Sequence, residues 1–334
     1  MTILYVTSDE QRAGKSAFCM ALATELGRRG RRIAVFKPIT SKKNPYDDPD
    51  PTAYEQLLGQ STQPPPLFGD IGGPDFASTL GAKISKIAEG QDDLLVESCA
   101  SISDTDAVDT VDAIDARVLL IIRFKANLNV NDLARWRDVY GHRLVGYVIN
   151  GLTRYQGTNV CNNLLPSMES KGLRVLGVIP EHRKLLGVTV RQLVTKLEGR
   201  FVGKAERIDR LVEHYLVGGL GLDSGESYFA LRENKAVIVR GDRPDIQMAA
   251  LKTPMACMIL TEGIEPIEYI ANEAELEAVP IIVVKMATLE TMDSLTSITE
   301  ESRFDHPDKL EAFAHLVDQH VDLDAVSKAF SSRG

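Results

Sequence analysis

Short, nearly continuous apolar runs alternate with amphipathic segments along most of the chain. Runs of this kind, rich in β-branched residues, predict strands buried on both faces, and apolar residues at helical spacing between them predict helices. In the first part of the chain the predicted strands are residues 2–7, 32–39, 93–97, 117–123, 143–150 and 173–180. This alternation predicts an α/β fold whose parallel sheet has helices on both faces.

The alternation restarts after a charged, irregular stretch at residues 181–207. It indicates a second, smaller α/β domain. The strands predicted there are residues 215–217, 235–239, 256–260 and 280–284. Since 334 residues are more than one ordinary core needs, we predict domains at residues 1–205 and 206–320, followed by a helical tail at 321–334, with two helices over 307–330.

The first turn from strand to helix carries the strongest chemical signal. The apolar run at residues 2–7 leads into Ser8-Asp-Glu-Gln-Arg-Ala-Gly-Lys-Ser16, and an amphipathic helix follows. In a P-loop, the glycine lets the backbone approach phosphate oxygens, the lysine reaches the β/γ-phosphates and the serine hydroxyl binds Mg²⁺. We therefore predict that Gly14, Lys15 and Ser16 bind a nucleotide at the helix N-terminus.

The loop departs from the usual G-x-x-x-x-G-K-[ST] pattern, because Asp9 stands where the first glycine is expected. A bare Gly-Lys-Ser also occurs by chance before helices, where it is only a helix N-terminus with an exposed lysine. We favour the nucleotide interpretation because strand, loop and helix are all in register.

Polar residues stand at the carboxyl ends of three predicted strands, where ligands bind in open α/β sheets. These residues are Lys37, Glu97 and Asn150. Glu97 has the place of the acid that holds Mg²⁺ in P-loop proteins. The Asn150 amide suits a purine edge or, equally, caps the turn with Gly151. Lys37 either faces the ligand crevice or is a solvated lysine at a strand end.

A proline- and acid-rich segment at residues 41–74 follows the second predicted strand and is expected to run over the surface. Its acids Asp47, Asp48 and Asp50 are further candidate Mg²⁺ ligands. Acids in such a loop are more often only solvated, and the sequence does not single out one of them.

Composition narrows the class of protein. With 44% hydrophobic and 25% charged residues the chain is an ordinary soluble protein, and its net charge of 38 − 47 = −9 argues against nucleic-acid binding. No apolar stretch approaches the roughly 18 residues of a membrane span, and the first run is too short for a signal peptide. The widely spaced cysteines predict reduced thiols without a zinc site. We expect a cytoplasmic protein. The cysteines that carry the prediction of reduced thiols are Cys19, Cys99, Cys161 and Cys257.

Two turns in the predicted second domain contain glycine. Gly219-Leu-Gly-Leu-Asp-Ser-Gly225 is one residue too long for a G-x-G-x-x-G fingerprint, so we expect a turn and no NAD site. Gly241, Asp242 and Arg243 stand where a strand passes into a helix, so their N–H groups and the guanidinium are predicted to hold an anionic ligand. In the alternative, Asp242 caps the helix and Arg243 pairs with a neighbouring acid.

The first-domain motifs together resemble the dethiobiotin synthetase-like branch of P-loop proteins. The resemblance rests on the loop at residues 8–16, on Val35-Phe-Lys-Pro-Ile39, on the acid-ended strand at Glu97 and on Val148-Ile-Asn150. That branch has a longer loop whose first glycine comes one position earlier, and Ser8 has this place here. The family pattern therefore accommodates Asp9.

The second domain resembles the DRTGG domain. The matching segments are residues 237–251, Met258-Ile-Leu-Thr261 and Val279-Pro-Ile-Ile-Val283. In this order, the two domains are similar to the N-terminal regulatory region of long bacterial phosphate acetyltransferases. The resemblance covers roughly residues 1–300.

The resemblance implies a role for each matched residue. ATP phosphates would be bound by Ser8, Gly14, Lys15 and Ser16. Magnesium would be held by Ser16, Glu97 and Asp50. Lys37 would be a catalytic residue that faces the γ-phosphate or a carboxylate substrate, and Asn150 would face the adenine. Dethiobiotin synthetases have a glycine-rich substrate turn after the acid, whereas Ser98-Cys99-Ala100-Ser101 follows Glu97 here.

Three functions follow as hypotheses. We expect an ATP- and Mg²⁺-binding regulatory protein that also senses an unknown small metabolite. The alternative is an ATP-dependent ligase that acts on a carboxylate or carbamate. In the third, the chain is a non-enzymatic partner of acetate metabolism that binds a catalytic subunit in trans. We expect a homo-oligomer or an acyltransferase as its protein partner. We do not expect a complete phosphate acetyltransferase, because its catalytic domain would need about 300 further residues.

Overall fold

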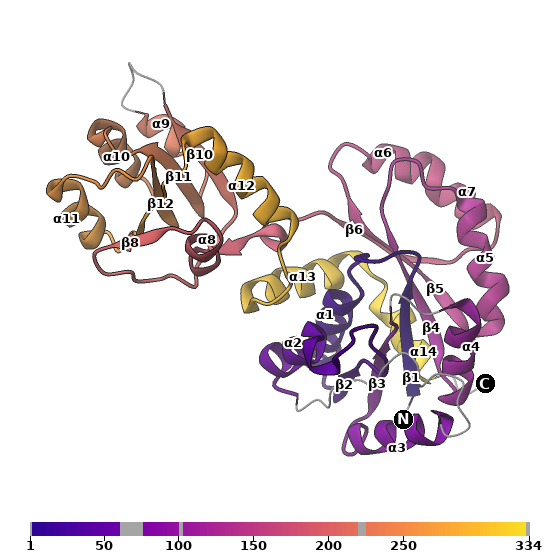
Figure 1. Cartoon of the computed structure of the whole chain (residues 1–334). Helices are drawn as coiled ribbons and strands as arrows, with labels where there is room; N and C mark the ends of the chain where they lie inside the picture. The colour runs from indigo at the N-terminus through magenta and orange to yellow at the C-terminus, as the bar shows by residue number, and fades with distance from the viewer. Residues whose placement is uncertain (1, 61–75, 100–102, 220–224, 332–334) are drawn as a thin grey trace. The chain divides into compact units, whose positions relative to one another are not determined.

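We describe the chain from a computed structural model that covers residues 2–60, 76–99, 103–219 and 225–331 (Figure 1). Backbone contacts divide it into two compact units. The first unit is Met1–Glu181 with Phe304–Gly334, and the second unit is His182–Arg303. Ala100 and Ser101 of the expected substrate turn, and most of the turn that begins at Gly219, lie outside the described residues.

The first unit is built on a six-stranded parallel sheet in the order β2-β3-β1-β4-β5-β6. Its strands are β1 (Thr2–Ser8), β2 (Ile33–Phe36), β3 (Asp93–Glu97), β4 (Arg117–Arg123), β5 (Leu144–Leu152) and β6 (Val175–Pro180). The predicted parallel sheet is confirmed. Because all six strands run the same way, their polar carboxyl-terminal residues meet at one edge.

Helices cover both faces of this sheet (Figure 1). On one face a buried cluster joins strand residues such as Tyr5 and Val96 to helix residues such as Val111 and Trp136. The helices that contribute to it are α3 (Phe76–Ile87), α4 (Asp104–Ala113), α5 (Val130–Tyr140) and α7 (Leu165–Ser170). A short helix α6 (Gly157–Asn159) and one π-helical turn (Val160–Leu164) precede α7.

The other face carries helix α1 (Lys15–Arg28) together with α13 (Pro307–His320) and α14 (Leu323–Ser331). α13 lies along α1 and reaches β6, and α14 contacts β1. The basic end of α1 meets acids of this carboxyl-terminal pair, since Arg29 lies 2.9 Å from Asp318 and 3.2 Å from Asp324. The two predicted final helices thus exist, but they complete the first unit.

The second unit has a five-stranded sheet in the order β10-β11-β12-β13-β8. Four strands are parallel, and β8 pairs antiparallel with β13 at one edge. The strands are β10 (His214–Gly218), β11 (Lys235–Arg240), β12 (Cys257–Thr261), β13 (Ile281–Val283) and β8 (Arg200–Val202). A separate antiparallel pair joins β7 (Val188–Thr189) to β9 (Leu211–Val212).

Helices on both sides of this sheet bury two apolar clusters. These helices are α8 (Val190–Lys196), α9 (Glu226–Phe229), α10 (Pro244–Leu251), α11 (Glu268–Leu276) and α12 (Thr288–Glu300). The second, smaller α/β unit is therefore confirmed. Its start at His182 differs from the predicted boundary near residue 205, because α8 and β8 pack within it.

In the described part of the chain, every helix is too short or too polar to cross a bilayer.

Candidate functional site

The turn between β1 and α1 leaves a helix N-terminus open to an anion. Gly14 takes a left-handed conformation, with φ +93°, and α1 begins at Lys15. No side chain caps α1, and its first turn contains no acid. By contrast, side chains of Asp48 and Asn129 cap α2 (Pro49–Leu58) and α5. The uncapped N–H groups and the helix dipole of α1 therefore favour a bound anion.

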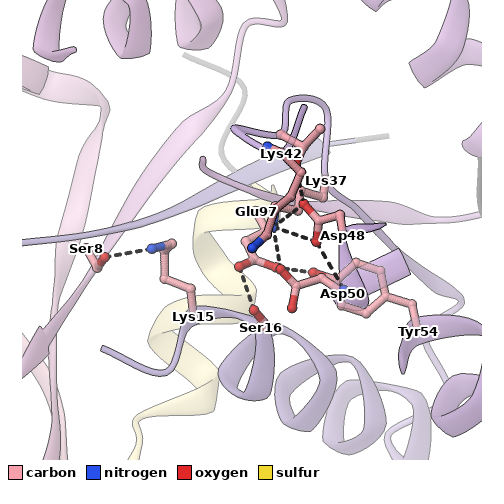
Figure 2. A network of polar contacts seen from close by, with 10 residues as sticks. Ser8, Lys15, Ser16, Lys37, Lys42, Asp48, Asp50, Tyr54 and Glu97 are labelled. Atoms are coloured by element: carbon pink, nitrogen blue, oxygen red, sulfur yellow. Dashed lines mark hydrogen bonds and ion pairs between the residues drawn. The ribbon is translucent and has the colours of Figure 1, made fainter. Parts of the chain in front are cut away.

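Lys15 lies within the loop and not in solvent, since it is 6% exposed. Its Nζ donates to Ser8 Oγ at 2.8 Å, and Ser8 Oγ donates to the Glu10 carbonyl at 2.6 Å (Figure 2). The structure thus brings together Ser8, Gly14 and Lys15 as predicted. A buried ammonium at an uncapped helix N-terminus is positioned to pair with phosphate oxygens.

Glu97 and Ser16 are in direct contact. Ser16 Oγ donates to Glu97 Oε1 at 2.7 Å, and Glu97 is buried at the carboxyl end of β3 (Figure 2). Burial and then the nearby Asp50 charge raise the pKa of Glu97 to about 7, against the opposing effect of nearby lysines. Hydroxyl and carboxylate oxygens are ligands that Mg²⁺ prefers.

Tyr54 closes the other side of Glu97. This fully buried α2 residue donates its hydroxyl to Glu97 Oε2, across 43 positions of sequence. Burial, together with the Glu97 charge, raises the pKa of Tyr54 well above its ordinary value, so the phenol stays a donor. Sequence reasoning missed Tyr54, because a tyrosine in a short helix carries no sign of its partner.

Lys37 is held by two acids of the segment that leads into α2. Its Nζ lies 2.9 Å from Asp48 Oδ2 and also pairs with Asp50 (Figure 2). Burial alone would lower the pKa of Lys37, but the charges of Glu97 and Asp50 outweigh burial and raise it. Asp48 also accepts from Thr40 Oγ1 at 2.6 Å. Asp50, a predicted metal ligand, is therefore engaged with Lys37 in this structure.

Asn150 supports the loop from behind. Its Nδ2 donates to the Ala13 carbonyl at 2.9 Å, and a Cβ on Gly14 would lie 2.5 Å from that same nitrogen. The positive φ favours glycine at position 14, and a larger residue there would also displace the Asn150 amide from the Ala13 carbonyl. Contact of Asn150 with adenine stays a prediction.

The acidic residues of the loop tether it to the end of β4. Asp9 Oδ1 accepts from the Arg123 backbone N–H at 3.3 Å, and Glu10 pairs with Lys125. Burial raises the pKa of Asp9. Asp9 thus stands in place of the expected glycine, and its side chain anchors the loop to the end of β4. The motif alone did not reveal this contact.

In the second unit, Gly241, Asp242 and Arg243 do lie between β11 and α10. Asp242 pairs with Arg240 at 2.7 Å and does not cap α10, while Arg243 pairs with Asp245 at 2.8 Å. The sequence alternative to an anion site was that Asp242 caps the helix and Arg243 pairs with a neighbouring acid. Its second part is confirmed. Anion binding here stays a prediction.

Among the described residues, no group of three or more His, Cys, Asp or Glu side chains forms a metal cluster. Mg²⁺ typically takes one or two protein oxygens and completes its octahedron with phosphate and water. Ser16 and Glu97 would supply these protein oxygens, and the ion would neutralise charge on a phosphate held at α1.

Two protein families match the chain. The AAA domain family (AAA_26) matches residues 2–189, which is more than half of the chain, and the DRTGG domain matches residues 192–298. These matches correspond to the two predicted resemblances in kind and order. The family boundary near residue 190 also lies closer to the division between the units than the predicted residue 205 does.

The curated relatives are phosphate acetyltransferases. That of Nitratidesulfovibrio vulgaris is 22% identical over 99% of this chain and 52% of its own length. That of Escherichia coli K12 is 21% identical over 93% of this chain and 50% of its own length. The chain spans about half the length of these relatives and is homologous to their N-terminal region.

Solved structures with a distantly similar fold include cobyrinic acid a,c-diamide synthase from Mycobacterium smegmatis with bound ATP analog and magnesium. It is 16% identical over 55% of this chain and 88% of that chain, with a TM-score of 0.39. The CBS and DRTGG domains of Clostridium perfringens pyrophosphatase are 15% identical over 47% of this chain and 77% of that chain, with a TM-score of 0.31.

Proposed function

The chain belongs to the AAA_26 family of AAA domains, with a DRTGG domain after it, and on this premise we propose that it binds ATP and Mg²⁺ as a regulatory or ligand-sensing protein. ATP binds at the loop of residues 8–16, and Mg²⁺ binds between Ser16 and Glu97. The second unit binds an unknown small metabolite. The proposal assigns no phosphate acetyltransferase activity to this chain.

The observation that supports it best is the uncapped N-terminus of α1 beside a buried lysine and a buried carboxylate. The N–H groups of the first turn, the Lys15 ammonium and the Ser16–Glu97 pair are groups of the kind that bind the phosphates and the metal in a P-loop, and they support the proposal. Each supplies a charge or a donor that a Mg²⁺-bound triphosphate needs.

Binding is favoured over ligase chemistry because of Lys37. In a ligase of the dethiobiotin synthetase type this lysine would face the γ-phosphate or the substrate, whereas here its ammonium is paired with Asp48 and Asp50. Groups that hold a nucleotide without an available lysine stabilise a ground state, which by itself does not accelerate a reaction.

Isothermal titration calorimetry of the full chain with ATP, in Mg²⁺ and in EDTA, tests the proposal. We expect saturable binding that Mg²⁺ strengthens, and hydrolysis that is slow with or without carboxylic acids. The absence of nucleotide binding would refute the assignment, and rapid ATP turnover with a carboxylic acid would favour the ligase.

A further inference from the structure

Helix α2 is attached to the P-loop site at two points. Asp48, which caps α2, and Asp50 in its first turn hold Lys37. One turn further along the helix, Tyr54 donates to Glu97 (Figure 2). Helix α2 therefore contacts both the Lys37 ammonium and the Glu97 carboxylate of the proposed nucleotide site.

The two oxygens of Glu97 have different partners. Oε1 accepts from Ser16 at the start of α1, and Oε2 accepts from Tyr54. Glu97 and Tyr54 are both buried, being 2% and 0% exposed, so water cannot readily replace a lost partner. With both oxygens bonded, the carboxylate is held in one orientation.

We propose that Tyr54 is a positioning residue for the metal site: its hydroxyl occupies Glu97 Oε2 and thereby directs Oε1 toward Ser16. This inference rests on the proposed binding of ATP and Mg²⁺. It assigns α2 a role in metal affinity, although none of its residues needs to touch the ion.

Removal of the Tyr54 hydroxyl would leave a buried carboxylate oxygen without a donor. Glu97 would then turn toward another donor, such as the nearby Lys37 ammonium, and lose its alignment with Ser16. Groups that orient a metal ligand typically contribute about 10- to 100-fold in metal affinity. The phosphate contacts of Lys15 and of the α1 N–H groups do not involve Tyr54.

The test measures ATP affinity of the full chain by calorimetry in Mg²⁺ and in EDTA, and takes the ratio of the two affinities as the Mg²⁺ factor. Tyr54→Phe should lower this factor about tenfold and leave the affinity in EDTA unchanged. Tyr46→Phe is the matched control, because Tyr46 lies just before α2 but is 78% exposed. A merely structural role of Tyr54 would instead weaken binding equally in both solutions, which would overturn the proposal.

A double-mutant cycle with Glu97→Gln separates action through Glu97 from other effects. In that background, Tyr54→Phe should not reduce the Mg²⁺ factor further, and additive losses would count against the proposal. If Mg²⁺ strengthens ATP binding equally in wild type and in Tyr54→Phe, the role of Tyr54 is overturned but the proposed function is not. A wild-type chain without ATP binding or without a Mg²⁺ factor would overturn the proposed function and this inference with it.

A second measurement needs no Tyr54 variant and applies even if Tyr54→Phe does not fold. Amide hydrogen exchange in α2 should slow when Mg²⁺ is added to the ATP complex of the wild type, and this slowing should be absent in Glu97→Gln. Equal exchange in α2 with and without Mg²⁺ in the wild type would contradict the proposed link.

Discussion

Ser16 and Glu97 lie 81 positions apart in sequence and are joined by a 2.7 Å hydrogen bond. The bond connects the first turn of α1, which follows β1, to the carboxyl end of β3. Strands β1 and β3 are neighbours in the sheet. The bond holds the two proposed magnesium ligands next to each other. Preorganisation of this kind reduces the cost of binding.

Replacement of Ser16 should therefore weaken the effect of Mg²⁺. We expect Ser16→Ala to lower the factor by which Mg²⁺ strengthens ATP binding by roughly tenfold or more, because a ligand oxygen is lost. Calorimetry measures the factor. Ser85→Ala is the control, since Ser85 is an exposed α3 residue whose hydroxyl donates to the Gly81 carbonyl of its own helix. An unchanged factor in Ser16→Ala would remove Ser16 from the metal site.

Lys15→Ala should weaken ATP binding in Mg²⁺ and in EDTA alike. A charge-assisted contact of this kind contributes about 1.5–3 kcal/mol, so the loss should be roughly 10- to 100-fold. Lys86→Ala, which removes an exposed lysine at the end of α3, should bind ATP as the wild type does. If titrations of Lys15→Ala and wild type coincide, the central assignment is wrong.

The affinity for Mg²⁺ in the ATP complex should rise with pH through neutrality. The pKa of Glu97 is about 7, well above its ordinary 4.5, so the carboxylate required by the metal forms only as pH passes that value. We expect the Mg²⁺ factor to grow from about pH 6 to about pH 8 more steeply in wild type than in Glu97→Gln, where only the terminal phosphate of ATP still titrates in this range. For stability the sign is opposite: the raised pKa contributes free energy of unfolding at low pH that is lost as pH rises through about 7.

Phe313→Ala should destabilise the first unit. Phe313 lies in α13, is 2% exposed and makes an edge contact with Phe304, so its truncation should cost about 3–5 kcal/mol. The single tryptophan, Trp136, is buried in the same unit, and its fluorescence reports the unfolding in urea. Leu289→Ala, at a 75% exposed position of the second unit, should leave this transition unchanged. Wild-type stability in Phe313→Ala would mean that α13 is an independent tail.

Gly241→Ala should destabilise the second unit through a clash. An added Cβ would lie 2.2 Å from the Ile264 carbonyl oxygen, and relief of such overpacking costs about 1–3 kcal/mol. Amide hydrogen exchange in β11 and β12 measures the loss. Gly219→Ala is the control, because no described atom lies within 4 Å of its added Cβ. Equal protection in both variants would show that Ile264 can move aside.

The sequence predicted both sheets and the P-loop because these features have local signatures. Apolar runs such as residues 93–97 report strands buried on both faces, and the Gly-Lys-Ser spacing reports a phosphate loop. Strands such as β8, with three residues, are too short to show a period and form only because β13 offers an edge. The amphipathic pattern likewise predicted α13 without saying that its apolar face packs on α1.

The partners of the site residues depend on contacts across the fold. The loop composition alone left three acids as equal candidates for the metal, and the family resemblance pointed to Asp50. The structure pairs both Asp48 and Asp50 with Lys37. That choice follows from where β2 ends and where α2 begins, which no local pattern encodes. Tyr54 and Glu97 meet for the same reason, since a buried carboxylate needs donors and the packing of α2 decides which residue supplies one.

The return of the chain to the first unit after residue 303 has a consequence for synthesis. A ribosome makes β1 to β6 first, then the whole of the second unit, and only then α13 and α14. Domains generally fold as they emerge from the ribosome. The second unit is therefore complete while the sheet of the first unit still lacks α13 and α14 on the face that carries α1. The first unit, whose strands are made first, therefore receives its last two helices only after the whole second unit has been made.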